Sequence, residues 1–299
     1  MKFLLGGVEL RTEQEMFDLI LEIANKDKRI RAVYMNGSRT NPNVVKDKYQ
    51  DYDIVFVVTE TESFLADKNW IEYFGEIAIV QEPDWNDVKT GLYEGQYDSS
   101  RRYAWLMLFK DGNRIDLSIE IKEEAEKNFI EDKLTVLLLD KDNFLPKIPF
   151  PTDEDYHVRK PNHDEYTAYC NDFWWCLNNV AKGIARDELP YAMEMYNLIV
   201  RRLLNGMINW YIGTLTDFSV STGKMGKYYK KYLPPELYGL YAKTYSDSDY
   251  NNFWASVIIA CKLFNKVALS VGKYFDFHYR QYEEDSIMDY ISKVRSGRL

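Results

Sequence analysis

Hydrophobic residues in the first half of the chain alternate between helical and strand spacing. Thr12 and Glu15 form a capping-box pattern, and apolar residues then recur every three to four positions as far as residue 24, which predicts a helix. Runs rich in β-branched and aromatic residues predict strands at residues 30–35, 53–58 and 76–80. Two further runs, 103–109 and 114–119, flank an Asp-Gly turn and predict an antiparallel hairpin. We therefore expect an N-terminal α/β domain with a mixed sheet.

The pattern becomes helical after a group of prolines. Four of the nine prolines cluster just after residue 145, at positions 146, 149, 151 and 161, and this concentration predicts a domain boundary. Long apolar stripes at helical spacing follow in residues 164–182, 191–212 and 252–273. We expect two domains, residues 1–150 and 151–299, of which the second is an all-α helical bundle.

Composition and charge restrict the class of partner. The chain has 299 residues, of which 46% are hydrophobic and 28% charged, as in a soluble globular protein. Its formal charge of −9 disfavours binding to a long phosphate backbone, so we expect no nucleic-acid partner. The three cysteines show no metal-binding spacing, and the apolar start is too short for a signal sequence. No apolar stretch approaches membrane-spanning length, so we expect a cytoplasmic protein.

Two acids at the mouth of a predicted strand are the strongest chemical signal. Asp51 and Asp53 are two residues apart, and because side chains alternate along a strand, both carboxylates point to one face. Like charges this close repel unless a cation lies between them. Magnesium prefers oxygen ligands of this kind and shares its coordination shell with substrate phosphates. The spacing therefore favours a magnesium site.

Other residues extend this candidate site. Gly37 and Ser38 end the preceding predicted strand, where a glycine allows a phosphate to approach the backbone, and Arg39 adds a positive charge. Asp116 lies between apolar residues of the predicted hairpin, so its charge requires a partner. A metal shared with the first two acids would supply that partner, although an ion pair with Arg114 would do the same.

The order of these motifs resembles a known superfamily. A Gly-Ser turn, an Asp-x-Asp leading into an apolar strand and a later strand aspartate are similar to the DNA polymerase beta nucleotidyltransferases. Four segments, GSRTNPN, QDYDIVFVV, WLMLFKDGNRIDL and PTDEDYHVRKP, resemble the aminoglycoside 6-adenylyltransferases that inactivate streptomycin. The resemblance covers the chain apart from about the first ten residues.

The resemblance implies a reaction and its cofactors. AMP would pass from ATP to a hydroxyl of an aminoglycoside, with position 6 of streptomycin as the expected site, releasing pyrophosphate and conferring resistance. Asp51, Asp53 and Asp116 would bind two Mg²⁺ ions. Asp116 would also be the general base, and Glu82 is an alternative from its place after a predicted strand. We expect a monomer or a weak homodimer.

The helical half supplies further candidates. A segment at residues 221–227 resembles one that places a lysine on the triphosphate in related enzymes, which favours Lys224 and Lys227 as phosphate contacts, although both could be surface lysines. Helical position alone adds Lys182 and Arg201. A guanidinium-bearing antibiotic requires carboxylates and flat rings. Residues of those types that could bind it are Asp84, Trp85, Asp172, Trp174 and Trp175. Because Trp174 and Trp175 are adjacent on a helix, we expect one of them in the core.

Two alternatives remain open from the sequence. The same chemistry could act on another acceptor, namely a nucleotide, a protein side chain or an RNA end. The other interpretation is a catalytically inactive module that binds nucleotides without turnover. Such a protein would be expected to have lost an acid or the Gly-Ser turn. This chain keeps both.

Overall fold

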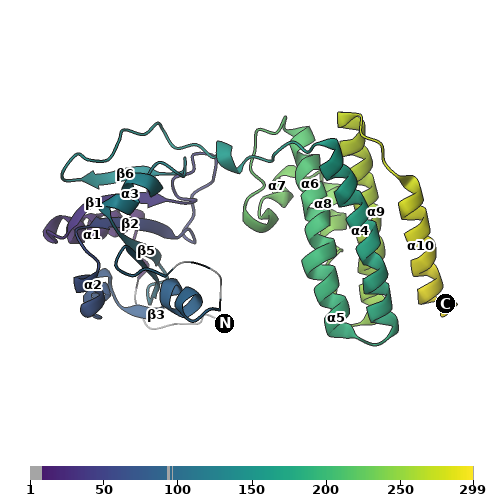
Figure 1. Ribbon diagram of the computed structural model, residues 1–299, viewed down its shortest axis with the longest axis horizontal. Coiled ribbons are helices and arrows are strands. Elements are labelled where there is room, and N and C mark those ends of the chain that lie inside the picture. Colours follow the sequence, from purple (N-terminus) through teal and green to yellow (C-terminus); the bar gives the residue numbers. More distant parts are fainter. Residues whose placement is uncertain (1–8, 93–94, 96, 299) are drawn as a thin grey trace. The chain divides into compact units, whose positions relative to one another are not determined.

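The computed structural model describes residues 9–92, 95 and 97–298, and their contacts divide into two compact units. Unit 1 is Met1–Asp155 and unit 2 is Tyr156–Leu299. Figure 1 shows a sheet with helices in unit 1 and helices alone in unit 2. A short 3₁₀ helix, η3 (Glu154–Tyr156), lies where the two units join.

The sheet of unit 1 is mixed, as predicted. Its strand order, within the described residues, is β3-β4-β5-β2-β1-β6. Strands β2 and β5 run parallel, and every other neighbouring pair is antiparallel. The strands are β1 (Ile30–Asn36), β2 (Tyr52–Val58), β3 (Ile77–Gln81), β4 (Arg102–Phe109), β5 (Arg114–Ile121) and β6 (Val136–Asp140).

The two faces of this sheet carry different helices. On one face α1 (Glu13–Lys26), α2 (Glu62–Ala66) and η1 (Trp70–Phe74) pack against alternate residues of β2, which include Ile54 and Phe56. The predicted capping box of Thr12 and Glu15 begins α1. On the other face α3 (Lys122–Asn128) covers a smaller cluster that includes Val55 and Val57. Because Asp53 has the same parity as Val55, its side chain belongs to this second face.

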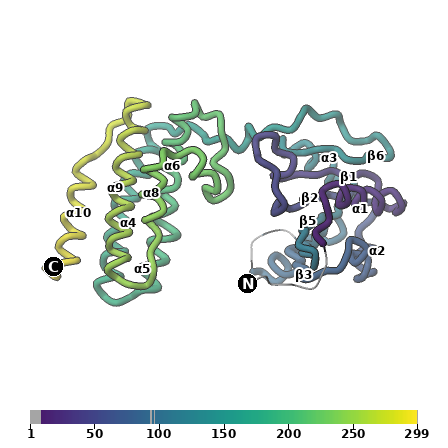
Figure 2. Tube along the Cα trace, turned by 180° about the vertical axis from the view of Figure 1, so that it is seen from behind, coloured from purple at the N-terminus to yellow at the C-terminus, as the bar shows by residue number. Residues whose placement is uncertain are grey.

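Unit 2 is built from the three predicted long helices and several that were not predicted. The predicted ones are α4 (His163–Ala185), α9 (Tyr250–Phe275) and a middle helix in which a π-helical turn, η4 (Met195–Val200), joins α5 (Leu189–Glu194) to α6 (Arg201–Leu215). Figures 1 and 2 both show α4, α6 and α9 side by side. The others are η5 (Lys224–Gly226), α7 (Tyr229–Tyr232), α8 (Pro235–Ala242) and α10 (Gln281–Arg295), which packs on α4.

Helix α9 corrects one expectation about the chain. With 26 residues and a mean hydropathy of 1.5, it is long and apolar enough to cross a membrane by length and composition. The sequence alone had indicated no apolar stretch of membrane-spanning length. Within the described residues, however, 56% of the most apolar 18-residue window of α9 is buried. The Phe264 ring of α9 stacks on Phe173 of α4 with centroids 3.7 Å apart. This packing is that of a core helix.

Candidate active site

The strand register brings the three predicted acids to one place. Asp53 on β2 is paired directly with Asp116 on the parallel strand β5. Paired residues on neighbouring strands point to the same face and their backbones lie about 4.8 Å apart. Asp51 immediately precedes the first residue of β2 and has the same parity as Asp53. The three carboxylates therefore lie on the face opposite α1.

The electrostatics of this group are those of a site in which negative charge is in excess. Burial, followed by the charges of Asp116 and Asp51, raises the pKa of the Asp53 carboxyl to about 6. Burial also raises the pKa of Asp51, where attraction to Arg114 acts in the opposite direction. A carboxyl that becomes harder to ionise because of neighbouring carboxylates is stabilised by a cation.

Arg114 occupies part of the acid cluster. Its Nε and Nη2 atoms donate to the two oxygens of Asp116, each at 2.7 Å, and Nη1 lies 3.5 Å from Asp51 Oδ2. As the side chains stand, no three His, Cys, Asp or Glu groups within residues 9–92, 95 and 97–298 form a ready metal-ligand set. The acids fit a divalent cation by donor type and charge. Asp116 can join such a set only when its oxygens are released from Arg114.

The raised pKa of Asp53 predicts how stability depends on pH. The folded protein binds this proton more tightly than the unfolded chain, whose carboxyl has its ordinary pKa of 3.8, so folding is favoured as pH falls through about 6. In buffer containing a chelator, the free energy of unfolding of unit 1 should gain about 1 kcal/mol from this group between pH 7 and pH 5. Urea denaturation of the wild type and of Asp53→Asn at both pH values measures the difference. An equal pH dependence in the two proteins would contradict the prediction.

The turn after β1 is shaped around Asp53. Gly37 has φ +78°, and a Cβ atom on it would lie 2.0 Å from Asp53 Oδ2. The carbonyl of Ser38 accepts a hydrogen bond from the Gln50 side chain at 3.3 Å, which ties this turn to the segment that leads into Asp51. The structure therefore brings the Gly37-Ser38 turn beside the acids, and its role in binding phosphate stays a prediction.

Arg39 does not face the phosphate position that we predicted. Its guanidinium donates to the carbonyls of Gln50 and Asp51, lies 3.8 Å from the Tyr52 ring centroid and pairs with Glu13 of α1. The side chain is buried. The sequence position of Arg39 beside Ser38 does not reveal that its side chain turns toward α1, and these contacts do not favour the predicted role in phosphate binding. Arg39 holds the segment that carries Asp51.

Glu82 is also turned away from the three acids. Its carboxylate accepts a hydrogen bond from the hydroxyl of Tyr103, whose ring belongs to the cluster on the α1 side of the sheet. The carboxylate is engaged on the face opposite Asp53 and Asp116. The structure therefore does not support Glu82 as the alternative general base.

Asp84 and Trp85 keep the features that made them candidates. They begin the π-helical turn η2 (Asp84–Lys89). Burial raises the pKa of Asp84, and its buried Oδ2 has no hydrogen-bond partner among the described residues. The Trp85 ring is half-exposed, and the ammonium of Lys89 lies 3.7 Å from its centroid. The pair offers a carboxylate oxygen and a ring face that already holds a cation.

Among the unit 2 candidates, Arg201 lies in the core. It is 4% exposed, donates to Thr244 Oγ1 and stacks on Tyr245 at 3.7 Å from the ring centroid. A phosphate could not reach it without opening the helical core, so its surroundings do not favour the predicted phosphate contact. Lys182, on α4, is half-buried, and no role for it follows from its surroundings.

The loop at residues 221–227 is held firmly while its lysines are exposed. Thr222 is buried, and its hydroxyl donates to Asn209 Oδ1 at 3.0 Å. The Tyr229 hydroxyl donates to the same oxygen at 2.8 Å, so one side chain of α6 fixes both ends of the loop. Lys224 and Lys227 are exposed on it. A fixed backbone that presents exposed lysines suits phosphate binding, and the role stays a prediction.

Of the two tryptophans of α4, one lies in the core, as expected, and the other is exposed. Trp174 is 1% exposed, packs against Phe173 and Phe264 and donates to the Tyr279 hydroxyl at 3.0 Å. It belongs to the core, and this burial does not favour the predicted contact with the antibiotic. Trp175 is 67% exposed, and Asp172, three residues earlier on the same helix, is exposed as well. These two remain candidates.

Sequence reasoning missed some residues that shape the candidate site. Arg114 was considered only as a partner that could make Asp116 structural. Its place two residues before Asp116 on one strand, hence on the same face, was the available signal. Asn209 gave no signal, because its two partners lie 13 and 20 residues away.

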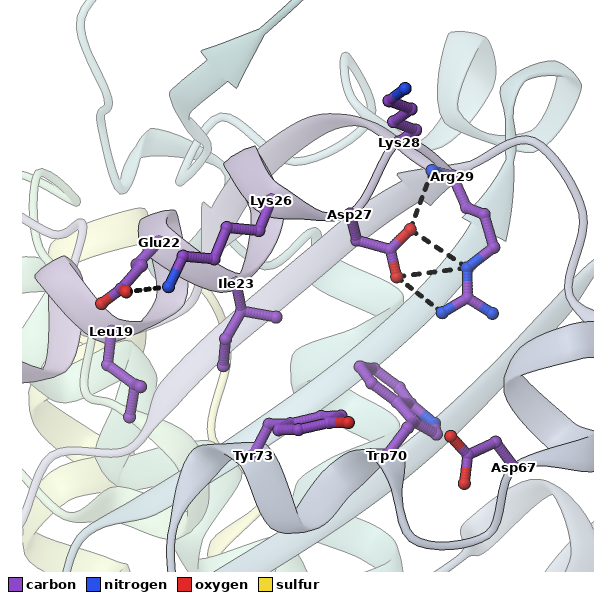
Figure 3. A pocket seen from close by; sticks show the side chains of 10 residues that line it. All are labelled: Leu19, Glu22, Ile23, Lys26, Asp27, Lys28, Arg29, Asp67, Trp70 and Tyr73. Atoms are coloured by element: carbon purple, nitrogen blue, oxygen red, sulfur yellow. Dashed lines mark hydrogen bonds and ion pairs between the residues drawn. The ribbon is translucent and has the colours of Figure 1, made fainter.

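A groove of about 600 Å³ lies elsewhere on unit 1, between the end of α1 and η1 (Figure 3). It is on the α1 side of the sheet and contains none of the three acids. Several of its charged groups are already paired, since Asp27 accepts hydrogen bonds from Arg29, and Lys26 binds Glu22. We assign it no part in the candidate site.

Comparison with known proteins shows similarity along almost the whole chain. Residues 10–294 match the streptomycin adenylyltransferase family. The chain is 40% identical over 286 residues to an aminoglycoside 6-adenylyltransferase of Campylobacter jejuni, covering 96% of each chain. It is 37% identical over 276 residues to a protein of the same name from Bacillus subtilis strain 168, covering 92% of this chain and 95% of that one. A Staphylococcus aureus protein, also so named, is 34% identical over 277 residues, covering 92% and 96%.

Proposed function

The chain belongs to the streptomycin adenylyltransferase family, and we propose that it transfers AMP from ATP to a hydroxyl of an aminoglycoside, with the 6-hydroxyl of streptomycin as the first candidate. The observation that carries the proposal is the pairing of Asp53 with Asp116 across parallel strands, beside Asp51 and the Gly37 turn. This places three carboxylates where a triphosphate and its metal ions could be held. The names of the three relatives indicate the class of acceptor, an aminoglycoside.

The chain's residues have distinct roles in the proposed reaction. Asp51, Asp53 and Asp116 would bind two magnesium ions, which when bound neutralise the triphosphate and stabilise the attacking and leaving oxygens. Asp116 accepts the proton of the acceptor hydroxyl as general base. The Gly37-Ser38 turn offers backbone N–H groups to the phosphates, and Lys224 and Lys227 add positive charge. Most of the acceleration would come from positioning and electrostatics.

The proposed antibiotic contacts match the chemistry of a polycation. A guanidinium group binds carboxylates through paired hydrogen bonds and stacks on flat rings. Asp84 and Trp85 in unit 1, and Asp172 and Trp175 in unit 2, are the candidate residues that leave such groups accessible or unpartnered. The formal charge of −9 would favour the approach of such a ligand.

A direct assay tests the function. The purified protein is incubated with ATP, Mg²⁺ and streptomycin, and pyrophosphate release is followed with and without the drug. Release that requires streptomycin, together with a drug mass increased by one AMP, is the expected result. If streptomycin gives none, a panel of other aminoglycosides, nucleotides, proteins and RNA ends with labelled ATP identifies the acceptor. ATP binding without transfer to any of them would contradict the proposal.

The loop lysines give a second prediction. Replacing Lys224 or Lys227 with methionine should raise the KM for ATP about tenfold, because each charged contact to a phosphate contributes about 1.5 kcal/mol or more. The value of kcat should change less. Lys230→Met is the matched control, since it removes an exposed lysine of α7 outside the loop. Equal KM values for the loop variants and the control would show that these ammonium groups do not contact ATP.

A further inference from the structure

Arg114 forms an unusually complete set of contacts with the acid cluster. It lies on β5 two residues before Asp116, so both side chains point to the same face of the sheet. Its planar guanidinium donates to both oxygens of Asp116 at 2.7 Å, and its Nη1 atom lies 3.5 Å from Asp51 Oδ2. A bidentate arginine–carboxylate pair of this kind is the strongest form of charged hydrogen bond.

We infer that Arg114 is an internal counter-cation that competes with the divalent ion for Asp116 and Asp51. The inference rests on the proposed metal role of the acids and extends it to a residue with no assigned role. The oxygens that Arg114 holds are the ones that Asp116 would offer to a metal. Binding of the ion therefore requires the guanidinium to leave at least one of them, and Arg114 sets the ion concentration at which the site fills.

The surroundings of Arg114 allow this exchange. Its side chain is 41% exposed, whereas that of Asp116 is 20% exposed. The guanidinium can turn into solvent on its flexible stem, while Asp116 stays in its strand. Asp53 makes no ion pair with Arg114 among the described contacts, so it stays available as the first ligand for the incoming ion. Arg114 thus screens the repulsion between the acids without closing the site.

Manganese binding tests the competition without ATP, antibiotic or turnover. Free Mn²⁺ is measured by electron paramagnetic resonance during titration of the full-length wild type and of Arg114→Gln. The variant should bind Mn²⁺ about tenfold more tightly, equivalent to 1.4 kcal/mol. Its melting temperature should also rise more with added Mn²⁺ than that of the wild type. Equal or weaker binding by the variant, including no binding by either protein, would overturn the inference.

Two further variants separate competition from other effects. Arg102→Gln removes the same charge from the neighbouring strand β4, where the side chain contacts Ser118 and neither Asp51 nor Asp116, so its affinity for Mn²⁺ should stay near that of the wild type. Arg114→Lys keeps the charge but cannot hold both oxygens of Asp116, and its affinity should lie between those of the wild type and Arg114→Gln. If both Arg114 variants match Arg102→Gln, the effect is net charge and the inference fails. Failure of the proposed function would instead appear as absent pyrophosphate release by a wild type that still binds Mn²⁺.

Discussion

Replacing Asp53 with asparagine is expected to abolish AMP transfer while making the protein more stable. Loss of a charged group that stabilises the transition state should lower kcat by roughly 10³-fold or more. The same carboxylate has a pKa of about 6 because burial and two neighbouring acids oppose its charge. Neutralising it should raise the free energy of unfolding of unit 1 by about 2 kcal/mol at pH 7, or its melting temperature by roughly 5 °C. Pyrophosphate release and thermal denaturation without metal measure the two effects.

Lost turnover together with raised stability would show that the missing carboxylate, and not misfolding, causes the loss of activity. A variant that merely misfolds loses activity together with stability, whereas Asp53→Asn should lose activity alone. Asp18→Asn is a suitable control, because it removes one negative charge from an exposed position on α1 that contacts Gln14. It should change neither quantity. Retained turnover in Asp53→Asn would contradict the catalytic role, and lowered stability would contradict the electrostatic one.

Replacing Gly37 with alanine is expected to be the second most damaging change. The new Cβ would lie 2.0 Å from Oδ2 and 2.7 Å from Cγ of Asp53, so the carboxylate must move. A displacement of about 1 Å in a catalytic group can cost about 100-fold in rate. The positive φ of +78° should add about 1 kcal/mol of backbone strain. Steady-state kinetics and chemical denaturation measure these losses.

A second glycine separates displacement of Asp53 from backbone strain. Gly91 has nearly the same φ, +75°, but a Cβ there would meet no atom of the described residues within 4 Å. Gly91→Ala should therefore lose about 1 kcal/mol of stability and keep its activity. If both alanine variants keep their activity, the close approach of Gly37 to Asp53 has no functional importance.

The parts of the fold that follow from local patterns were predictable. The β-branched and aromatic run of β2 and the Asp-Gly hairpin predicted the strands that carry Asp53 and Asp116, and apolar stripes predicted α4 and α9. Strand β6 was missed because a run of four apolar residues does not by itself distinguish a strand from a helical segment, and pairing with β1 makes it a strand. Helix α10 was missed because its sequence is strongly polar and its burial is limited to a few side chains such as Ile291.

The candidate site was predictable in type of residue more than in direction of side chain. Asp51 and Asp53 share a face because strands alternate, which sequence alone gives. That Asp116 lies beside them depends on the pairing of β2 with β5, a contact between residues 63 positions apart. Arg39, Glu82, Arg201 and Trp174 had suitable chemistry, but each turns toward partners that adjacent sequence does not reveal. A charged or aromatic side chain of suitable chemistry can therefore be structural, with its contacts in the core or behind the site.

The proposed metal centre requires three acids to act together. Crystals grown with Mn²⁺ and a non-hydrolysable ATP analogue would locate the ions by their anomalous scattering. We predict ions about 2.1 Å from oxygens of Asp51 and Asp53, with Asp116 as a further ligand and Arg114 displaced from at least one oxygen of Asp116. Ions bound elsewhere, with Arg114 still holding both oxygens of Asp116, would contradict the proposed centre.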